Sequence, residues 1–108
     1  MLALSAEDMR RAVTLPEAMD AVAAAFAQLS GGQATVPLRP RVPDPALEEL
    51  LLVMPAYLAG SGALRVKALT LYGRNPSERG IPAIAALVLP FDVRDGRPQA
   101  LLDGKWLT

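Results

Sequence analysis

Three basic side chains, Arg39, Arg41 and Lys67, are the best candidates for chemistry in this 108-residue sequence. Arg39 and Arg41 lie two residues apart in the stretch 35–45, which holds four prolines and should be an edge strand or a loop of fixed shape. Residues two apart on an extended chain share a side, so both guanidinium groups could face one concavity. A guanidinium can hold a carboxylate through two parallel hydrogen bonds, and an ammonium adds a compact second charge. The spacing is therefore compatible with a carboxylate site, although ordinary surface arginines and a lysine whose ammonium reaches the solvent are the more common outcome.

A glycine pair at Gly60-Ser61-Gly62 has the opening of a dinucleotide-binding fingerprint. Arg65 occupies the place of the third glycine, and no long helix is expected after it. A hairpin turn is the simpler explanation.

Composition excludes several classes of function. Eleven basic and eleven acidic residues give no net charge, which argues against nucleic-acid and membrane partners. The sequence has no Cys and no His, so disulfides, thiolate chemistry, the usual zinc ligands and the commonest general base are all missing. We expect no metal site and no Ser-His catalysis.

The first residues lack the basic start and continuous apolar core of a signal peptide. Apolar stretches such as 21–27 and 83–90 are far shorter than the roughly 20 residues that span a bilayer. A cytoplasmic protein is expected.

Two helices are expected near the N-terminus. Ser5 stands before two acids, a typical N-cap with a favourable first turn, and predicts a short helix over 6–12. Thr14 and Glu17 form a capping box around a first-turn proline and begin a helix of roughly four turns, which Gly31-Gly32 ends.

Hairpins should follow these helices. Strands are expected at 50–56, 63–71, 83–91 and 99–102, with turns at 60–62 and 95–96 and a loop over 72–80. Connections of hairpin length join antiparallel neighbours. The pattern predicts one α+β domain over residues 1–108, in which the N-terminal helices pack on a largely antiparallel sheet.

Short motifs run along nearly the whole chain in a distinctive order. They are Glu17-Ala18-Met19, Val36-Pro37-Leu38-Arg39, Met54-Pro55-Ala56-Tyr57, Val66-Lys67, Asn75-Pro76, Gly80-Ile81-Pro82 and Leu101-Leu102-Asp103-Gly104-Lys105-Trp106-Leu107-Thr108. Their order and spacing resemble the ornithine cyclodeaminase/mu-crystallin family. The resemblance implies an N-terminal substrate-binding and dimerisation domain, followed in the full-length family by a Rossmann domain that binds NAD or NADP.

Matched position by position, the resemblance implies roles for three residues. Arg39 corresponds to the arginine that grips the substrate carboxylate, and Lys67 to the lysine that contacts the same substrate. Met54 is expected to line the pocket, although a core methionine at a strand end explains it equally well. Arg41 has no assignable counterpart, so a surface or dimer-interface charge is favoured. The chain itself is expected to hold no catalytic, cofactor-binding or metal-binding residue.

The sequence departs from the family pattern at three places. Leu52 stands where true cyclodeaminases carry an acid that assists proton transfer, and Ala83 stands where a Thr or Ser often approaches the nicotinamide. The family's Arg-Thr-Ala-Ala segment, whose arginine bridges substrate and cofactor, is expected just beyond Thr108. The Rossmann domain is thus absent from these 108 residues, which look truncated.

The resemblance implies an N-terminal fragment of an NAD(P)-dependent amino-acid or cyclic imino-acid oxidoreductase, or of an ornithine cyclodeaminase-like enzyme. Such a fragment would bind a small amino or imino acid, form a homodimer and be inactive alone. The alternative is a non-enzymatic dimerising or small-acid-binding module left by gene truncation.

Overall fold

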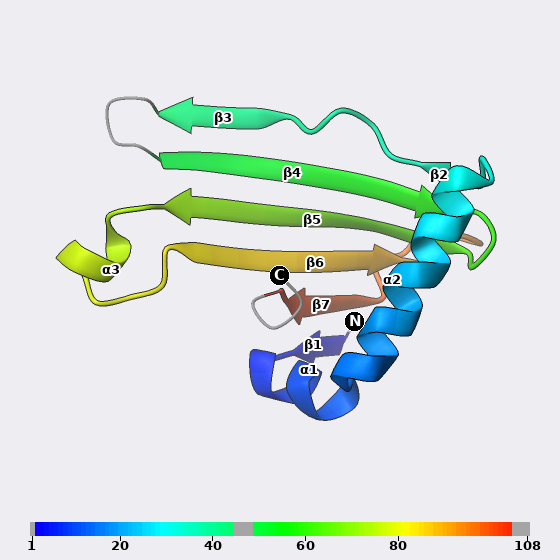
Figure 1. The fold of residues 1–108 in the computed structure, drawn as a ribbon, viewed down its shortest axis with the longest axis horizontal. Coiled ribbons are helices and arrows are strands. Elements are labelled where there is room, and N and C mark those ends of the chain that lie inside the picture. The colour runs from blue at the N-terminus through cyan, green and yellow to red at the C-terminus, as the bar shows by residue number, and fades with distance from the viewer. Residues whose placement is uncertain (1, 45–48, 105–108) are drawn as a thin grey trace.

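Seven strands of this chain form one mixed sheet, with two helices near the N-terminus (Figure 1). The structure is a computed structural model and describes residues 2–44 and 49–104. The elements in chain order are β1 (Leu2–Leu4), α1 (Ala6–Ala12), α2 (Leu15–Ser30), β2 (Ala34–Thr35), β3 (Arg41–Asp44), β4 (Glu49–Leu58), β5 (Ala63–Tyr72), α3 (Asn75–Glu78), β6 (Ile84–Phe91) and β7 (Ala100–Asp103).

The strand order is β1-β7-β6-β5-β4-β2, and β3 also pairs with β4. All of these pairs are antiparallel except β1 with β7, where Leu2 lies beside Ala100 and Leu4 beside Leu102. The predicted α+β class with a largely antiparallel sheet is therefore confirmed. The short strand β1 was not predicted.

Both helices begin at the predicted N-caps, and each N-cap is part of a capping box. The Ser5 hydroxyl accepts from the Asp8 N–H at 3.1 Å, while the Asp8 carboxylate accepts from the Ser5 N–H at 2.9 Å. The Thr14 hydroxyl and the Glu17 carboxylate make the same reciprocal pair at the start of α2, at 3.3 and 3.4 Å. Each box satisfies backbone donors that the first helical turn leaves unpaired, so the sequence predicted both starts correctly.

The predicted turns are present. Antiparallel β4 and β5 are joined through Gly62, whose φ is +65°, and the β6–β7 connection turns at Gly96 with φ +76°. The segment 60–62 is thus a hairpin turn and not a phosphate-binding loop. The predicted loop over 72–80 contains the single turn of α3.

The two faces of the sheet differ in what covers them. One face carries the even-numbered residues 50–58 of β4, the odd-numbered residues 63–71 of β5 and the even-numbered residues 84–90 of β6. We call this the helix face, because α2 lies over it at one end of the strands (Figure 1). The opposite, open face exposes apolar side chains, including Val42, Tyr57, Leu64 and Leu87.

The buried core is small and lies on the helix face. Of the described side chains, the buried apolar ones are Met9 of α1 with Leu69, Ala86 and Val88 of the central strands. Gly104 closes the end of β7 against this core, since its N–H donates to the Ala86 carbonyl at 2.8 Å. A Cβ at position 104 would lie 2.9 Å from the Ala86 Cβ, so only glycine fits there without a shift.

Helix α2 leaves its apolar stripe largely uncovered. Phe26 is 64% exposed, and Leu15, Met19, Val22 and Leu29 are exposed as well, although this spacing normally marks a core-facing stripe. The reason is that α2 makes its main contacts with β2 and β4, while a hollow lies between the helix and the neighbouring part of the sheet. None of the helices in the described ranges is long and apolar enough to span a membrane.

Candidate functional site

Arg39, Met54 and Lys67 lie in one row across three neighbouring segments of the sheet. Met54 of β4 pairs directly with Lys67 of β5. The Pro40 carbonyl accepts from the Val53 N–H at 3.1 Å, so the β3–β4 pairing continues beyond Arg41 and brings Arg39 beside Met54. We call these three residues the basic row. Residues paired across a sheet share a face, so all three belong to the helix face.

The two cations of the basic row interact electrostatically. The pKa of Lys67 is lowered from its ordinary value of 10.5, first by partial burial of the ammonium and second by the positive charge of Arg39. Two like charges held together without a counter-ion favour the binding of an anion. The structure thus brings together the two residues that the sequence proposed as carboxylate ligands.

The helix face carries four basic residues, Arg39, Arg41, Arg65 and Lys67. Their side chains make no hydrogen bond or ion pair with any described residue. Arg41 pairs with Leu52, and Arg65 precedes Lys67 by two residues on β5, so both share the face of the basic row. The helix-face positions of the described strands carry no acidic residue. A chain with no net charge therefore concentrates unpaired positive charge on one face.

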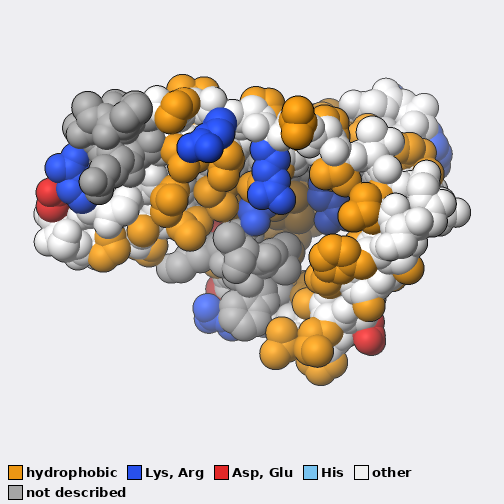
Figure 2. Space-filling model, turned by 45° about the horizontal axis from the view of Figure 1, so that its top comes forward, with side chains coloured by type: hydrophobic (Ala, Val, Ile, Leu, Met, Phe, Trp, Pro, Cys, Tyr) orange, Lys and Arg blue, Asp and Glu red, His pale blue; other side chains and the backbone are white. Residues whose placement is uncertain are grey.

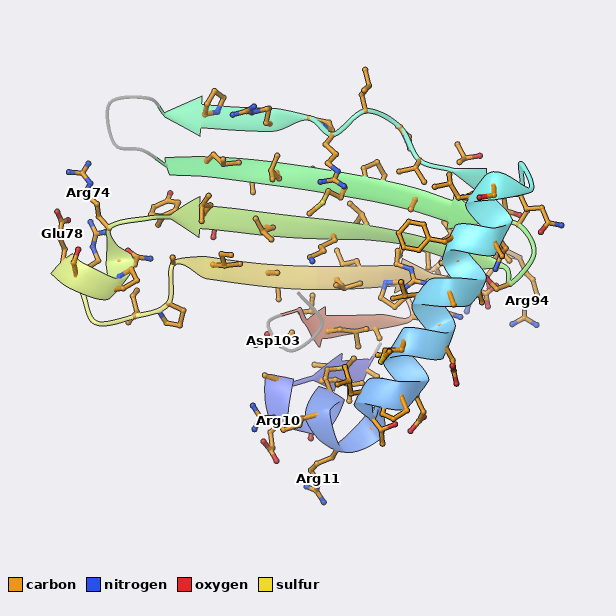
Figure 3. The ribbon with its side chains drawn as sticks, viewed as in Figure 1. Arg10, Arg11, Arg74, Glu78, Arg94 and Asp103 are labelled. Carbon is orange, nitrogen blue, oxygen red and sulfur yellow. The ribbon has the colours of Figure 1, made fainter. Side chains whose placement is uncertain are left out.

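Basic residues elsewhere in the described chain have partners. The ion pairs are Arg10–Glu7 at 2.8 Å, Arg74–Glu78 at 3.8 Å, Arg94–Asp92 at 2.8 Å and Arg97–Asp95 at 3.5 Å. The Arg79 guanidinium donates to the Asn75 side-chain oxygen at 2.9 Å, and the charge of Arg11 acts on Asp8. Figure 3 shows Arg10, Arg74 and Arg94 at the periphery, away from the middle of the sheet.

A hollow of about 610 Å³ lies between α2 and the helix face, next to the basic row. Its walls are mainly apolar side chains of α2, β2, β4 and β5, among them Ala25, Phe26 and Ala56. Arg65 lines it, together with the polar residues Gln28 and Ser61. Figure 2 shows basic side chains gathered over the strands beside this hollow. An apolar hollow next to paired cations can accept a small organic acid.

The described residues do not fit a nicotinamide dinucleotide. Such a cofactor needs a glycine-rich turn that leads from a strand into the N-terminus of a helix. The one glycine-rich candidate, Gly60-Ser61-Gly62, joins two antiparallel strands instead. Among the described residues, no three His, Cys, Asp or Glu side chains gather as metal ligands.

The structure also places other residues that the sequence analysis singled out. Leu52 lies on the helix face next to the basic row, paired with Arg41 and Leu69. Ala83 lies just before β6, where its carbonyl accepts from the Tyr72 N–H at 2.8 Å. The motif residues Lys105 to Thr108 are outside the described residues. The alternation over 63–71 already puts Arg65 on the same side of its strand as Lys67, but the sequence analysis did not propose Arg65 as a site residue.

Comparison with known proteins identifies relatives over the whole chain. The family model described as "Ornithine cyclodeaminase/mu-crystallin family" matches residues 1–108. A Delta(1)-pyrroline-2-carboxylate reductase of Bacillus cereus is 32% identical over 108 residues, covering 100% of this chain and 33% of the relative. The ketimine reductase mu-crystallin of Mus musculus is 35% identical over 109 residues, covering 97% of this chain and 34% of the relative. The chain spans about a third of the length of these curated relatives.

Solved structures agree with this assignment. The Delta(1)-pyrroline-2-carboxylate reductase of Thermococcus litoralis, in complex with NADH and L-proline, superposes with a TM-score of 0.94 at 36% identity, covering 99% of this chain and 33% of that one. An archaeal alanine dehydrogenase dimer with bound NAD gives 0.91 at 28% identity, covering 99% of this chain and 32% of that one. The relatives are thus oxidoreductases of small amino or imino acids. The chain belongs to the ornithine cyclodeaminase/mu-crystallin family.

Proposed function

We propose that this chain is the substrate-binding part of an NAD(P)-dependent oxidoreductase that acts on a small amino or imino acid. Arg39 and Lys67 would bind the substrate carboxylate, and Met54 between them would form the floor of the site. The observation that carries the proposal is the unpaired cation pair of the basic row, whose charges act on each other. A carboxylate between a guanidinium and an ammonium forms charge-assisted hydrogen bonds and removes the repulsion.

In this proposal the chain contributes positioning and charge complementarity. Hydride chemistry belongs to the nicotinamide, and these residues offer no place for its dinucleotide. We therefore expect the 108-residue chain alone to show no NADH-dependent turnover of any imino acid. A rate above background with the purified chain, followed by NADH absorbance, would overturn this part of the proposal.

Calorimetry tests the carboxylate site directly. The purified chain should bind small amino and keto acids weakly, and Arg39→Ala and Lys67→Ala should each abolish the heat of binding. Arg11→Ala is the matched control, because it removes an exposed cation from α1, away from the basic row. Unchanged binding in both basic-row variants, with circular dichroism showing intact folds, would disprove the site.

We also propose a homodimer formed through the open face of the sheet. Neither α1 nor α2 packs on this face of β4 and β5, and Leu64 and Leu87 stand exposed on it. Exposed apolar surface of this kind usually marks an interface. The archaeal alanine dehydrogenase is a dimer, which supports a dimer here.

A non-enzymatic dimerising or acid-binding module is the second candidate, because the described residues hold both the open face and the basic row. The coding sequence after Thr108 separates the two. An in-frame Arg-Thr-Ala-like segment and a glycine-rich loop would support the enzyme, whereas an immediate stop codon would support the module. A cytoplasmic location remains part of both proposals.

A further inference from the structure

We propose that Arg65 binds a second anionic group of the substrate, so that the site takes a short dicarboxylic amino, imino or keto acid. This inference rests on the proposed binding of the first carboxylate by Arg39 and Lys67. Its starting point is that Arg65 has no hydrogen bond or ion pair through its side chain with the described residues, although it lines the hollow beside the basic row.

The register of β5 places Arg65 next to Lys67 on the same face. Their Cα atoms are roughly 7 Å apart, since a strand rises about 3.4 Å per residue. Ala56 pairs with Arg65, whereas the bulkier Met54 pairs with Lys67. The small side chain of Ala56 leaves room above the sheet, and the hollow opens on this side. An acid held at Lys67 can therefore extend its side chain toward Arg65.

The lining of the hollow favours a ligand that carries a charge at its far end. Arg65 is the charged residue among the described residues that line it, and the walls around it are mainly apolar. Arg65 is exposed in the free chain, so an apolar ligand that covered its guanidinium would remove its water without supplying a counter-ion, which is unfavourable. A carboxylate on the ligand removes that cost, and a purely apolar side chain does not.

Gln28 lies at one edge of the hollow. Its side-chain oxygen is buried without a hydrogen-bond partner, and its amide nitrogen lies 3.5 Å from the Ser61 hydroxyl.

Arg41 is a poorer candidate for this role. It lies on the opposite side of the basic row, in register with Leu52 and Leu69. Leu69 is buried, and neither leucine lines the hollow. Arg41 therefore provides a matched control, because it is a cation of the same type on the same face.

The test compares acids that differ by one carboxylate, by calorimetry on the 108-residue chain at constant ionic strength. Oxaloacetate is set against pyruvate, and aspartate against alanine. We expect the wild type to prefer each dicarboxylate. Arg65→Met should weaken dicarboxylate binding about tenfold or more, because a charge-assisted hydrogen bond is lost. The same variant should leave monocarboxylate binding within about twofold. Arg65→Lys should restore part of the preference, and Arg41→Met should leave it unchanged.

The variants separate the two proposals. If Arg39→Ala and Lys67→Ala abolish binding while the wild type shows no preference for dicarboxylates, the carboxylate site stands and the role of Arg65 is wrong. An equal loss for both acids in Arg65→Met would also overturn that role. If neither basic-row variant affects binding, or if no acid binds to the folded chain, the proposed function fails and this inference fails with it.

Discussion

Arg39 and Lys67 lie on opposite sides of Met54 in one row of the sheet, close enough for the charge of the guanidinium to act on the ammonium. Burial and this charge together hold the pKa of Lys67 below 10.5. Arg65 and Arg41 lie on the same face of the sheet and add further positive charge. The pair is thus prepared for an anion, and its titration can be measured.

We predict that Arg39→Ala raises the pKa of Lys67, and that binding of pyruvate raises it in the wild type. Lys105 is the other lysine, so NMR titration in a Lys105→Arg background would follow Lys67 as the sole lysine ammonium. Arg11→Ala should leave the titration unchanged. If Arg39→Ala does not move the titration of Lys67, the two charges do not interact.

The same shift predicts a pH dependence of stability. The folded chain releases the Lys67 proton at lower pH than the unfolded chain does, so unfolding takes up a proton between the lowered pKa and 10.5. The contribution of Lys67 to the free energy of unfolding should rise with pH over that range. The affinity for small carboxylic acids should fall over the same range, because Lys67 loses its positive charge. Urea unfolding of the wild type and Lys67→Met at several pH values measures the difference. A parallel pH dependence in both proteins would contradict the assignment.

Gly104→Ala should destabilise the chain by about 1–3 kcal/mol, the usual cost of an overpacked core. The new Cβ would meet the Ala86 Cβ at 2.9 Å, and the Gly104 N–H bond to the Ala86 carbonyl prevents the strand end from moving away. Gly73→Ala is the control, because a Cβ there meets no atom within 4 Å and its φ is not positive. Equal midpoints of urea unfolding for both variants would show that the contact is not tight.

Thr14→Ala should cost about 1 kcal/mol of stability, because the first turn of α2 loses its side-chain acceptor. Thr14→Ser keeps the hydroxyl that accepts from the Glu17 N–H and should retain most of it. Urea unfolding must use one protein concentration, since a dimer gains stability with concentration. A loss in Thr14→Ser as large as in Thr14→Ala would mean that the methyl group, and not the hydroxyl, matters.

Leu87→Lys should convert a dimer into a monomer in light scattering, because it places a charge on the open face. Leu87 is 48% exposed and pairs with Asp103 on β7, so the chain itself can accommodate the new ammonium. Val93→Lys adds the same charge at an exposed position after β6 and should leave the dimer intact. A wild-type chain that stays monomeric at high concentration would rule out the dimer.

Local chemistry made much of the fold predictable. The boundaries of α1 and the start of α2 follow from residues at most three positions apart, and so do the turns at Gly62 and Gly96. Strand β5 was predicted from the alternation over 63–71, and the observed strand extends one residue further, to Tyr72. Arg39 and Lys67 were chosen for their residue types and their resemblance to the family, and the register then placed them in one row.

Features that depend on distant partners were missed. Strand β1 has three residues, and its partner β7 lies almost a hundred residues away, so no local pattern could indicate it. The apolar stripe of α2 has the period of a core-facing helix, but a hollow separates it from the sheet, and Phe26 remains exposed. Sequence periodicity shows which side of a helix is apolar and does not show how much of that side a partner covers.

The pairing of β1 with β7 also affects how the chain folds. Strands β4 and β5 close over residues 59–62, and β5 and β6 over residues 73–83, whereas β1 must wait for Leu102 before Leu4 has a neighbour. Pairings between distant residues are slow to form because loop closure costs entropy before any contact rewards it. We expect the central meander to form first and the N-terminal strand to dock last. During synthesis, β1 would leave the ribosome well before β7 and would still be among the last elements to reach its native place.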